Sequence, residues 1–215
     1  EKKQYVVESN TVTIKAGERV AKFRMKGIYE NIDKTDSLSV TFNLLAKDEN
    51  VWDLYGTRTR VQMQKACPFE LSTFEGYCLL TSSFFSAYMT NTEHRLLRTE
   101  KDKTDDNTII LHDFFYKNYD IKIKYDPSDP LKPFVEFDDQ IIGSTAEAFG
   151  TIHGDGKIMC TQPVAYDSYY NVCQKFVILY TTLYVVGKGT VGTYVNILEW
   201  ISDEEAEQYK KEEGL

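Results

Sequence analysis

The strongest constraint on the fold of this chain is a two-residue alternation of apolar and polar side chains. In segment 119–125 the apolar members are Tyr119, Ile121, Ile123 and Tyr125, and the residues between them are Asp120, Lys122 and Lys124. Successive side chains of a β-strand point to opposite faces, so this period is typical of a strand with one wet face. Segments 21–26 and 38–44 alternate in the same way. The sequence therefore predicts a mainly β protein with antiparallel sheets.

The composition supports this fold class and limits the partners. The 215 residues include 15 Tyr and 12 Phe but only 2 Trp, and Tyr and Phe favour pleated, half-buried surfaces. The formal net charge of −8 argues against nucleic acid as a partner, because phosphate binding depends on clustered Lys and Arg. The longest apolar stretch, 176–186, is too short for a membrane helix.

The rhythm of the chain changes near residues 66–71, where Pro68 interrupts the first pattern. We expect a first module, residues 1–67, with a small antiparallel sheet or sandwich whose last strand is 57–64. The second module, residues 68–215, contains the candidate strands 74–81, 93–99, 107–114, 119–125, 133–141, 148–153, 157–161, 175–186 and 190–200. Closure into an up-and-down barrel is the usual way in which many short strands avoid free edges.

The C-terminal segment changes period again. Ser202 and Glu205 form a capping box, and Lys210 and Lys211 lie toward the negative end of the helix dipole. This pattern predicts a helix over about 203–212. Segment 82–89 is compatible with either a helical turn or a loop.

Four widely spaced cysteines, Cys67, Cys78, Cys160 and Cys173, form neither a CxxC pair nor a zinc-type cluster. We therefore expect no metal site and no cofactor. In an exported protein four cysteines allow disulfides in any of three pairings. We favour free, mostly buried thiols, since a chain of this length does not depend on disulfides for its stability.

The candidate catalytic residues have simpler structural interpretations. His112 falls in a predicted strand beside Ile110 and Phe114, which favours a packed or hydrogen-bonded core histidine over a general base. Glu136 and Asp138 share a strand face, as a glycosidase pair would, but such neighbours arise by chance in an acidic protein. We therefore predict that the protein is not an enzyme. A hydrolase that uses these carboxylates or His112 is the weaker alternative.

Segment 162–171 is the candidate binding site. It is predicted to be a long connection, and it carries Tyr166, Asp167, Tyr169, Tyr170 and Asn171. Flat aromatic rings beside carboxylate and amide groups suit both sugars and peptides. In the alternative interpretation the tyrosines fold back and plug the barrel. We expect this of at least one of them, and exposure of Tyr169.

Two parts of the chain resemble a known family. Thr11–Phe23 (TVTIKAGERVAKF), followed by Asp36–Leu45 (DSLSVTFNLL), resembles the later strands of a Calx-beta or immunoglobulin-like module of Bacteroides surface proteins. Gly150–Gly156 (GTIHGDG) and Gly189–Trp200 (GTVGTYVNILEW) resemble the second part of Bacteroides lipoproteins with a domain of unknown function, where a lipocalin-like barrel follows. The resemblance implies this same order here. It also implies a first module whose initial strand lies upstream or is supplied by residues 4–7.

The resemblance further implies a cellular location. Such lipoproteins are exported and held at the outer membrane by a lipid on a cysteine that this chain does not contain. We expect a non-enzymatic cell-surface protein that binds an extracellular glycan or peptide at the mouth of its barrel. The alternative is a structural or assembly subunit of a cell-envelope complex whose sheet edges dock onto its partners. The sequence does not indicate an oligomeric state.

Overall fold

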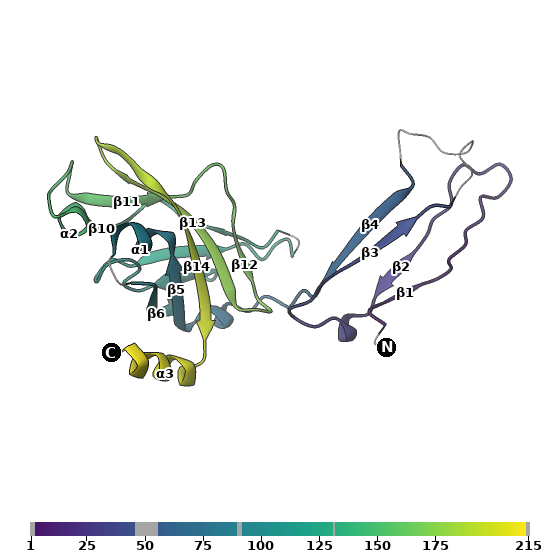
Figure 1. The fold of residues 1–215 in the computed structure, drawn as a ribbon, viewed down its shortest axis with the longest axis horizontal. Helices are drawn as coiled ribbons and strands as arrows, with labels where there is room; N and C mark the ends of the chain where they lie inside the picture. The colour runs from purple at the N-terminus through teal and green to yellow at the C-terminus, as the bar shows by residue number, and fades with distance from the viewer. Residues whose placement is uncertain (1–2, 46–55, 90–91, 131, 214–215) are drawn as a thin grey trace. The chain divides into compact units, whose positions relative to one another are not determined.

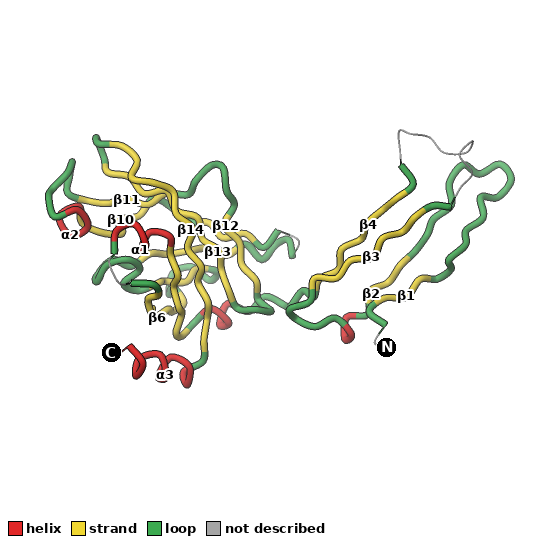
Figure 2. The backbone as a smooth tube through the Cα atoms, viewed as in Figure 1, coloured by secondary structure: helices red, strands yellow, loops and turns green. Residues whose placement is uncertain are grey.

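The structure is a computed structural model that describes residues 3–45, 56–89, 92–130 and 132–213. The chain forms two compact units, Glu1–Cys67 and Pro68–Leu215, called unit 1 and unit 2 below. In the described residues of both units, most of the regular secondary structure is antiparallel β-strand, and loops connect the strands, as Figures 1 and 2 show.

The described residues of unit 1 form two small sheets. β1 (Tyr5–Val7) pairs with β2 (Met25–Gly27), β3 (Ser37–Asn43) pairs with β4 (Arg58–Gln64), and the 3-10 helix η1 spans Tyr29–Asn31. Phe23 and Phe42 make an edge-to-face contact with their ring centroids 4.9 Å apart. Within the part of unit 1 that the structure describes, Ile32 is the only buried hydrophobic residue, at 5 % exposure. The hydrophobic core that these described residues form is therefore small.

Unit 2 contains most of the secondary structure. Its strands are β5 (Gly76–Ser82), β6 (His94–Lys101), β7 (Thr108–Leu111), β8 (Ile121–Tyr125), β9 (Phe134–Glu136), β10 (Gln140–Ser144), β11 (Lys157–Thr161), β12 (Ser168–Asn171), β13 (Phe176–Val185) and β14 (Gly189–Ile201). Its helices are η3 (Leu71–Phe74, 3-10), α1 (Ser83–Tyr88), α2 (Thr145–Phe149) and α3 (Asp203–Glu213).

Eight of these strands form a closed antiparallel barrel. The order around the barrel is β13-β12-β9-β8-β7-β6-β5-β14, and the pairing of β14 with β13 closes it. β11 pairs with residues 182–184 of β13, beyond the stretch that pairs with β12, and β10 follows β11 as an extension of the sheet. Figure 1 shows β13 and β14 as the long neighbouring strands of this barrel. The expected mainly β fold with an antiparallel barrel is confirmed.

Alternating side chains fill the barrel interior. The inward residues of β13, namely Val177, Leu179, Thr181, Leu183 and Val185, are buried, and the residues between them are half-buried. The Asn196 amide donates to the Thr181 hydroxyl at 3.0 Å and to the Leu179 carbonyl at 2.9 Å, and it accepts from Ser82 at 2.6 Å. These bonds satisfy a fully buried amide and connect β5, β13 and β14.

Aromatic side chains close both ends of the barrel. At the end where η3 precedes β5, Phe74 stacks on Tyr125 at 4.6 Å and meets the Trp200 ring at 5.0 Å. At the other end, where α1 follows β5, Phe84 stacks on Phe115 at 4.6 Å. The barrel is therefore a packed core.

Several local predictions are confirmed. The capping box starts α3, since the Ser202 N–H donates to the Glu205 carboxylate at 2.8 Å and the Glu205 N–H donates to the Ser202 hydroxyl at 3.2 Å. The predicted strand 157–161 is β11, and the undecided segment 82–89 contains α1. None of the helices in the described ranges combines the length and apolar character of a membrane span.

Two strand predictions were wrong. Segment 148–153 contains the end of a helix, because the Ser144 hydroxyl caps α2 by accepting from the Ala146 N–H at 3.2 Å. Gly150, with a φ of 71°, ends that helix in a left-handed conformation that suits glycine. The predicted strand 133–141 is divided between β9 and β10.

The cysteine prediction was half right. Cys78 and Cys160 are free and buried, as expected. Cys67 and Cys173 are disulfide-bonded, which the sequence did not decide.

Candidate functional site

The candidate site is a row of aromatic and aliphatic side chains on the outer wall of the barrel. Tyr169 of β12 lies opposite Phe134 of β9 on one side and opposite Ile178 of β13 on the other. Its neighbours in sequence, Ser168 and Tyr170, are buried and point inward, so Tyr169 points outward. We call the group Phe134, Tyr166, Tyr169, Phe176, Ile178 and Tyr180 the outer platform.

Tyr166 is the most exposed ring of the outer platform. It lies in the connection between β11 and β12, with 54 % of its surface exposed, and it stacks on Tyr180 of β13 with centroids 5.1 Å apart. This contact holds one face of the Tyr166 ring against the barrel wall and leaves the side chain largely accessible. Tyr169, at 40 % exposure, meets the edge of Phe176 at 6.3 Å.

Tyr170 belongs to the core and not to the platform. It is 5 % exposed and lies 5.2 Å from Tyr125 and 5.9 Å from Phe74 between ring centroids. Its hydroxyl donates to the Asp126 carbonyl at 3.2 Å, and burial raises its pKa. Of the three predicted tyrosines, one therefore helps to plug the barrel and two face outward.

The polar residues predicted beside these rings have different surroundings. Asp167 is exposed next to Tyr166. The Asn171 side-chain oxygen accepts from the Gln174 N–H at 3.0 Å, which stabilises the turn between β12 and β13. Asp167 can therefore offer its carboxylate to a ligand, whereas the Asn171 oxygen is already engaged within the chain.

The mouth of the barrel is not where the accessible aromatic surface lies. Phe74 and Phe84, at opposite ends, are each 0 % exposed. A ligand at either end would have to displace these packed rings, and removing a large core side chain costs about 3–5 kcal/mol. The candidate binding site is therefore on the outer wall of the barrel, and not at the mouth as the sequence analysis expects.

The free thiols are poorly suited to nucleophilic catalysis. Burial raises the pKa of Cys160 to about 12 and the pKa of Cys78 well above its usual value. A thiol is nucleophilic as the thiolate, which such values suppress near neutral pH.

His112 does not occupy the predicted place in the core. It follows the end of β7, is about one third exposed, and lies between two carboxylates: its Nδ1 is 2.9 Å from Asp120 and its Nε2 is 3.6 Å from Glu100. Asp120 also accepts from the Asp113 N–H at 2.9 Å. These contacts join the ends of β6, β7 and β8.

The predicted carboxylate pair is open to solvent. Glu136 and Asp138 are both exposed. The hydrogen bond with Asp105 is the main cause that raises the pKa of Lys124 on β8, and the charges of Asp138 and Glu136 add to it. The neighbouring Asp139 accepts from the Tyr184 hydroxyl at 2.7 Å. Hydrogen bonds from Thr161 and Tyr184 lower the pKa of Asp139, so it is held as a carboxylate. Among the residues that the structure describes, no group of three or more His, Cys, Asp or Glu side chains could hold a metal ion.

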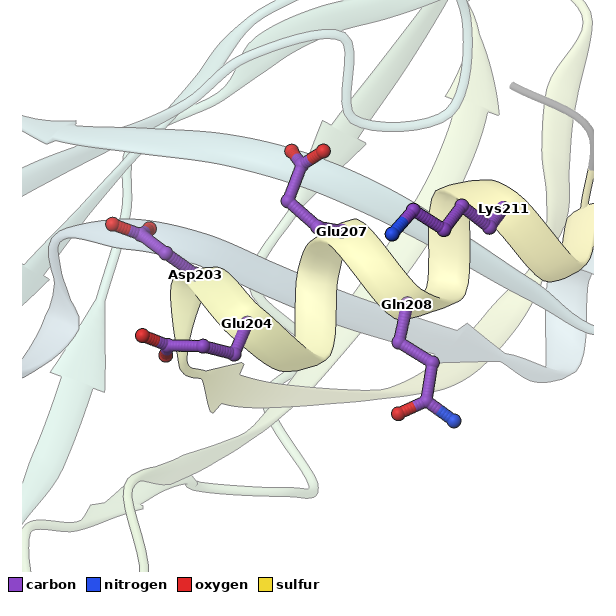
Figure 3. A pocket seen from close by; sticks show the side chains of 5 residues that line it. All are labelled: Asp203, Glu204, Glu207, Gln208 and Lys211. Atoms are coloured by element: carbon purple, nitrogen blue, oxygen red, sulfur yellow. The ribbon is translucent and has the colours of Figure 1, made fainter.

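A shallow depression lies at α3, outside the barrel wall. Figure 3 shows that Asp203, Glu204, Glu207, Gln208 and Lys211 line it and that all five side chains leave this single helix. A depression formed by the flexible polar side chains of one surface helix lacks the concave apolar walls of a ligand site.

Comparison with known proteins assigns the barrel region to one family. A domain of unknown function (DUF4984) matches residues 54–212, which is more than half of the chain. No curated protein and no solved structure matches the chain. The matched region includes the outer platform. The matched region also includes β4 of unit 1. The strand β3, which pairs with β4, lies before the first matched residue.

Sequence reasoning missed four members of the outer platform, namely Phe134 of β9 and three residues of β13. Phe176, Ile178 and Tyr180 alternate with buried residues along β13, so they share one outward face. The alternation could have shown that these residues lie together. It could not show that β12 would pair beside them, because the sequence predicts a connection over 162–171, whereas residues 168–171 form β12 in the structure.

Proposed function

Since the chain belongs to the DUF4984 family, a domain of unknown function, we propose a function from the geometry of the barrel wall. The protein is a non-enzymatic binding protein that holds an extracellular glycan on its outer platform. The observation that carries this proposal is the exposed pair Tyr166 and Tyr169, fixed by contacts with Tyr180 and Phe176 on a packed barrel.

A rigid aromatic surface suits a sugar ring. The C–H faces of a sugar pack on a Tyr ring, and the phenol hydroxyls and the Asp167 carboxylate can bond to sugar hydroxyls. Binding a ligand costs little side-chain entropy here, because a tyrosine has only two side-chain torsions. The contacts of Tyr166 and Tyr169 with the barrel wall restrict these torsions before binding and reduce the entropy cost further. A peptide could use the same rings, and it is the competing ligand in the test below.

The location that fits this function is the cell envelope. We propose that the protein is exported and attached to the outer membrane by a lipid anchor upstream of Glu1. The disulfide-bonded state of Cys67 and Cys173 supports export, because structural disulfides persist in oxidising compartments. Protease treatment of intact cells should digest the protein if it faces outward.

A glycan array probed with the whole chain tests the function. We expect binding to at least one glycan, and we expect the double substitution Tyr166→Ala and Tyr169→Ala to weaken it by roughly 30-fold, the effect of losing one aromatic hot spot of about 2 kcal/mol. Tyr29→Ala is the matched control, because Tyr29 is 47 % exposed but lies in unit 1.

Two results would count against the proposal. Glycan binding that survives the double substitution would place the ligand elsewhere. An empty glycan array together with a peptide ligand that is lost in the double variant would keep the outer platform but replace glycan by peptide.

A further inference from the structure

We propose that the free edge of β4 in unit 1 accepts an extended peptide strand whose outward residues are acidic and whose inward residues are apolar. Such strand addition is an established mode of peptide recognition, in which main-chain hydrogen bonds provide affinity and alternate side chains provide specificity. The proposal concerns unit 1 and is independent of the outer platform.

The edge of β4 is long and regular. β4 pairs with β3 through seven consecutive residue pairs without a register shift, and no other described strand pairs with it. Its sequence, Arg58–Gln64, contains no proline. Bulges, prolines and very short strands are common means of blocking a sheet edge, and β4 has none of them.

The inner face of this sheet can bury more apolar surface. Val61 and Met63 of β4 lie opposite Val40 and Leu38 of β3, and all four are only half-buried. A two-stranded sheet is marginally stable in water, and three or more strands with an apolar face are usually needed. An added strand with apolar inward residues would cover these side chains and enlarge the small core of unit 1.

The outer face of the β3-β4 sheet, opposite Val61 and Met63, determines which charge the added peptide strand should carry. Arg58 and Arg60 are exposed on the face opposite Val61, and neither forms an ion pair with any described residue. Their cross-strand neighbours on β3 are Asn43 and Thr41, which are uncharged. A strand on the other side of β4 would place its outward residues beside these arginines, where acidic side chains attract and basic ones repel.

This charge pattern favours an acidic strand over a second copy of β4. A second copy would bring the same two arginines into the new sheet, where like charges across strands are destabilising.

The test uses the whole chain and capped seven-residue peptides as probes. One peptide alternates glutamate with valine, and its charge-reversed counterpart alternates lysine with valine. By NMR titration we expect the glutamate peptide to bind about tenfold more tightly, since two cross-strand charge pairs change sign between the probes. Its binding should slow hydrogen exchange in β4 and leave exchange in β14 unchanged.

Charge-reversal variants locate the site. The pair Arg58→Glu and Arg60→Glu should reverse the peptide preference. The matched pair Arg24→Glu and Lys26→Glu changes the net charge equally on exposed residues at and beside β2, and it should leave the preference as in the unaltered chain. Circular dichroism should show that both variants keep the fold.

Several outcomes would overturn the proposal. They are failure of both peptides to bind, equal binding of the two, or an equal effect of the β2 variant, which would indicate non-specific attraction. A dimer in analytical ultracentrifugation whose β4 amides are already protected would show that a second copy occupies the edge.

Discussion

Trp200 of β14 donates its indole N–H to the hydroxyl of Thr99 of β6 at 3.0 Å, inside the barrel. The same hydroxyl donates to the carbonyl of Phe74 at 3.0 Å, in η3. One side chain thus satisfies two buried polar groups from distant parts of the sequence and holds the aromatic plug against the barrel wall.

We predict that Thr99→Val destabilises the protein by about 1–3 kcal/mol, because it leaves the Trp200 N–H and the Phe74 carbonyl without their partner. Thr99→Ser keeps the hydroxyl and should cost less. Urea unfolding at neutral pH measures both values. A valine variant as stable as the unaltered chain would show that the bond contributes nothing.

Tyr169 and Tyr170 are adjacent in sequence but should respond oppositely to substitution. Tyr170→Ala removes a 5 % exposed ring from the core and should cost about 3–5 kcal/mol. Tyr169→Ala removes an outward ring and should change stability by about 0.5 kcal/mol or less. Denaturation curves of the two variants give the comparison. A large loss of stability in the Tyr169 variant would contradict its assignment to the exposed surface.

The oxidation state of the cysteines predicts a thiol count. In denaturant without reductant, two thiols should react, those of Cys78 and Cys160, and after reduction all four should react. In the native protein the reaction should be slow, because burial shields both free thiols and raises the pKa of each. A dithionitrobenzoate assay performs this count. Four reactive thiols before reduction would contradict the disulfide.

We predict that the protein loses stability in acid because the stabilising contribution of the Asp102 carboxylate is lost. A hydrogen bond from Lys122, together with bonds from the Thr104 hydroxyl and N–H, holds the pKa of Asp102 well below its usual range. In the unfolded chain the same carboxyl takes up a proton near its ordinary pKa of about 3.9, so acid favours unfolding. This contribution is complete above about pH 5 and declines as the pH falls below about 4.

Urea unfolding at pH 6, 4 and 3 tests the role of Asp102. The fall in stability with pH should be smaller in Asp102→Asn than in the unaltered chain. Asp106→Asn is the control, because it also removes one carboxylate near Asp102, and the Asp106 side chain is 97 % exposed. Identical pH profiles for the Asp102 variant and the unaltered chain would disprove the assignment.

Local patterns predicted much of the secondary structure. The alternation in 119–125 corresponds to β8, and the capping box at Ser202 corresponds to α3. Both signals lie within a few residues of the element that they specify, so they can be read without knowledge of the fold. The helix α2 was missed because its signals, the Ser144 cap and Gly150, flank a segment of only five residues.

The candidate site could be predicted only in part. Aromatic residues next to Asp and Asn drew attention to segment 162–171, and Tyr166 and Tyr169 do lie on the surface. Their neighbours Phe134 and Tyr180 come from β9 and β13, and no spacing in the sequence connects them with Tyr169. Strand order determines these neighbours.

The sequence by itself determined the class of the fold, because the direction of each side chain along a strand follows from backbone geometry. It determined in the same way that Tyr169 and Tyr170 would face opposite sides once they formed part of a strand. Only the tertiary structure decided which side became the core, because β12 had to pair between β9 and β13 for Tyr170 to reach Tyr125 and Phe74. Pairing between distant segments depends on the burial that the whole barrel provides, and no local pattern records it.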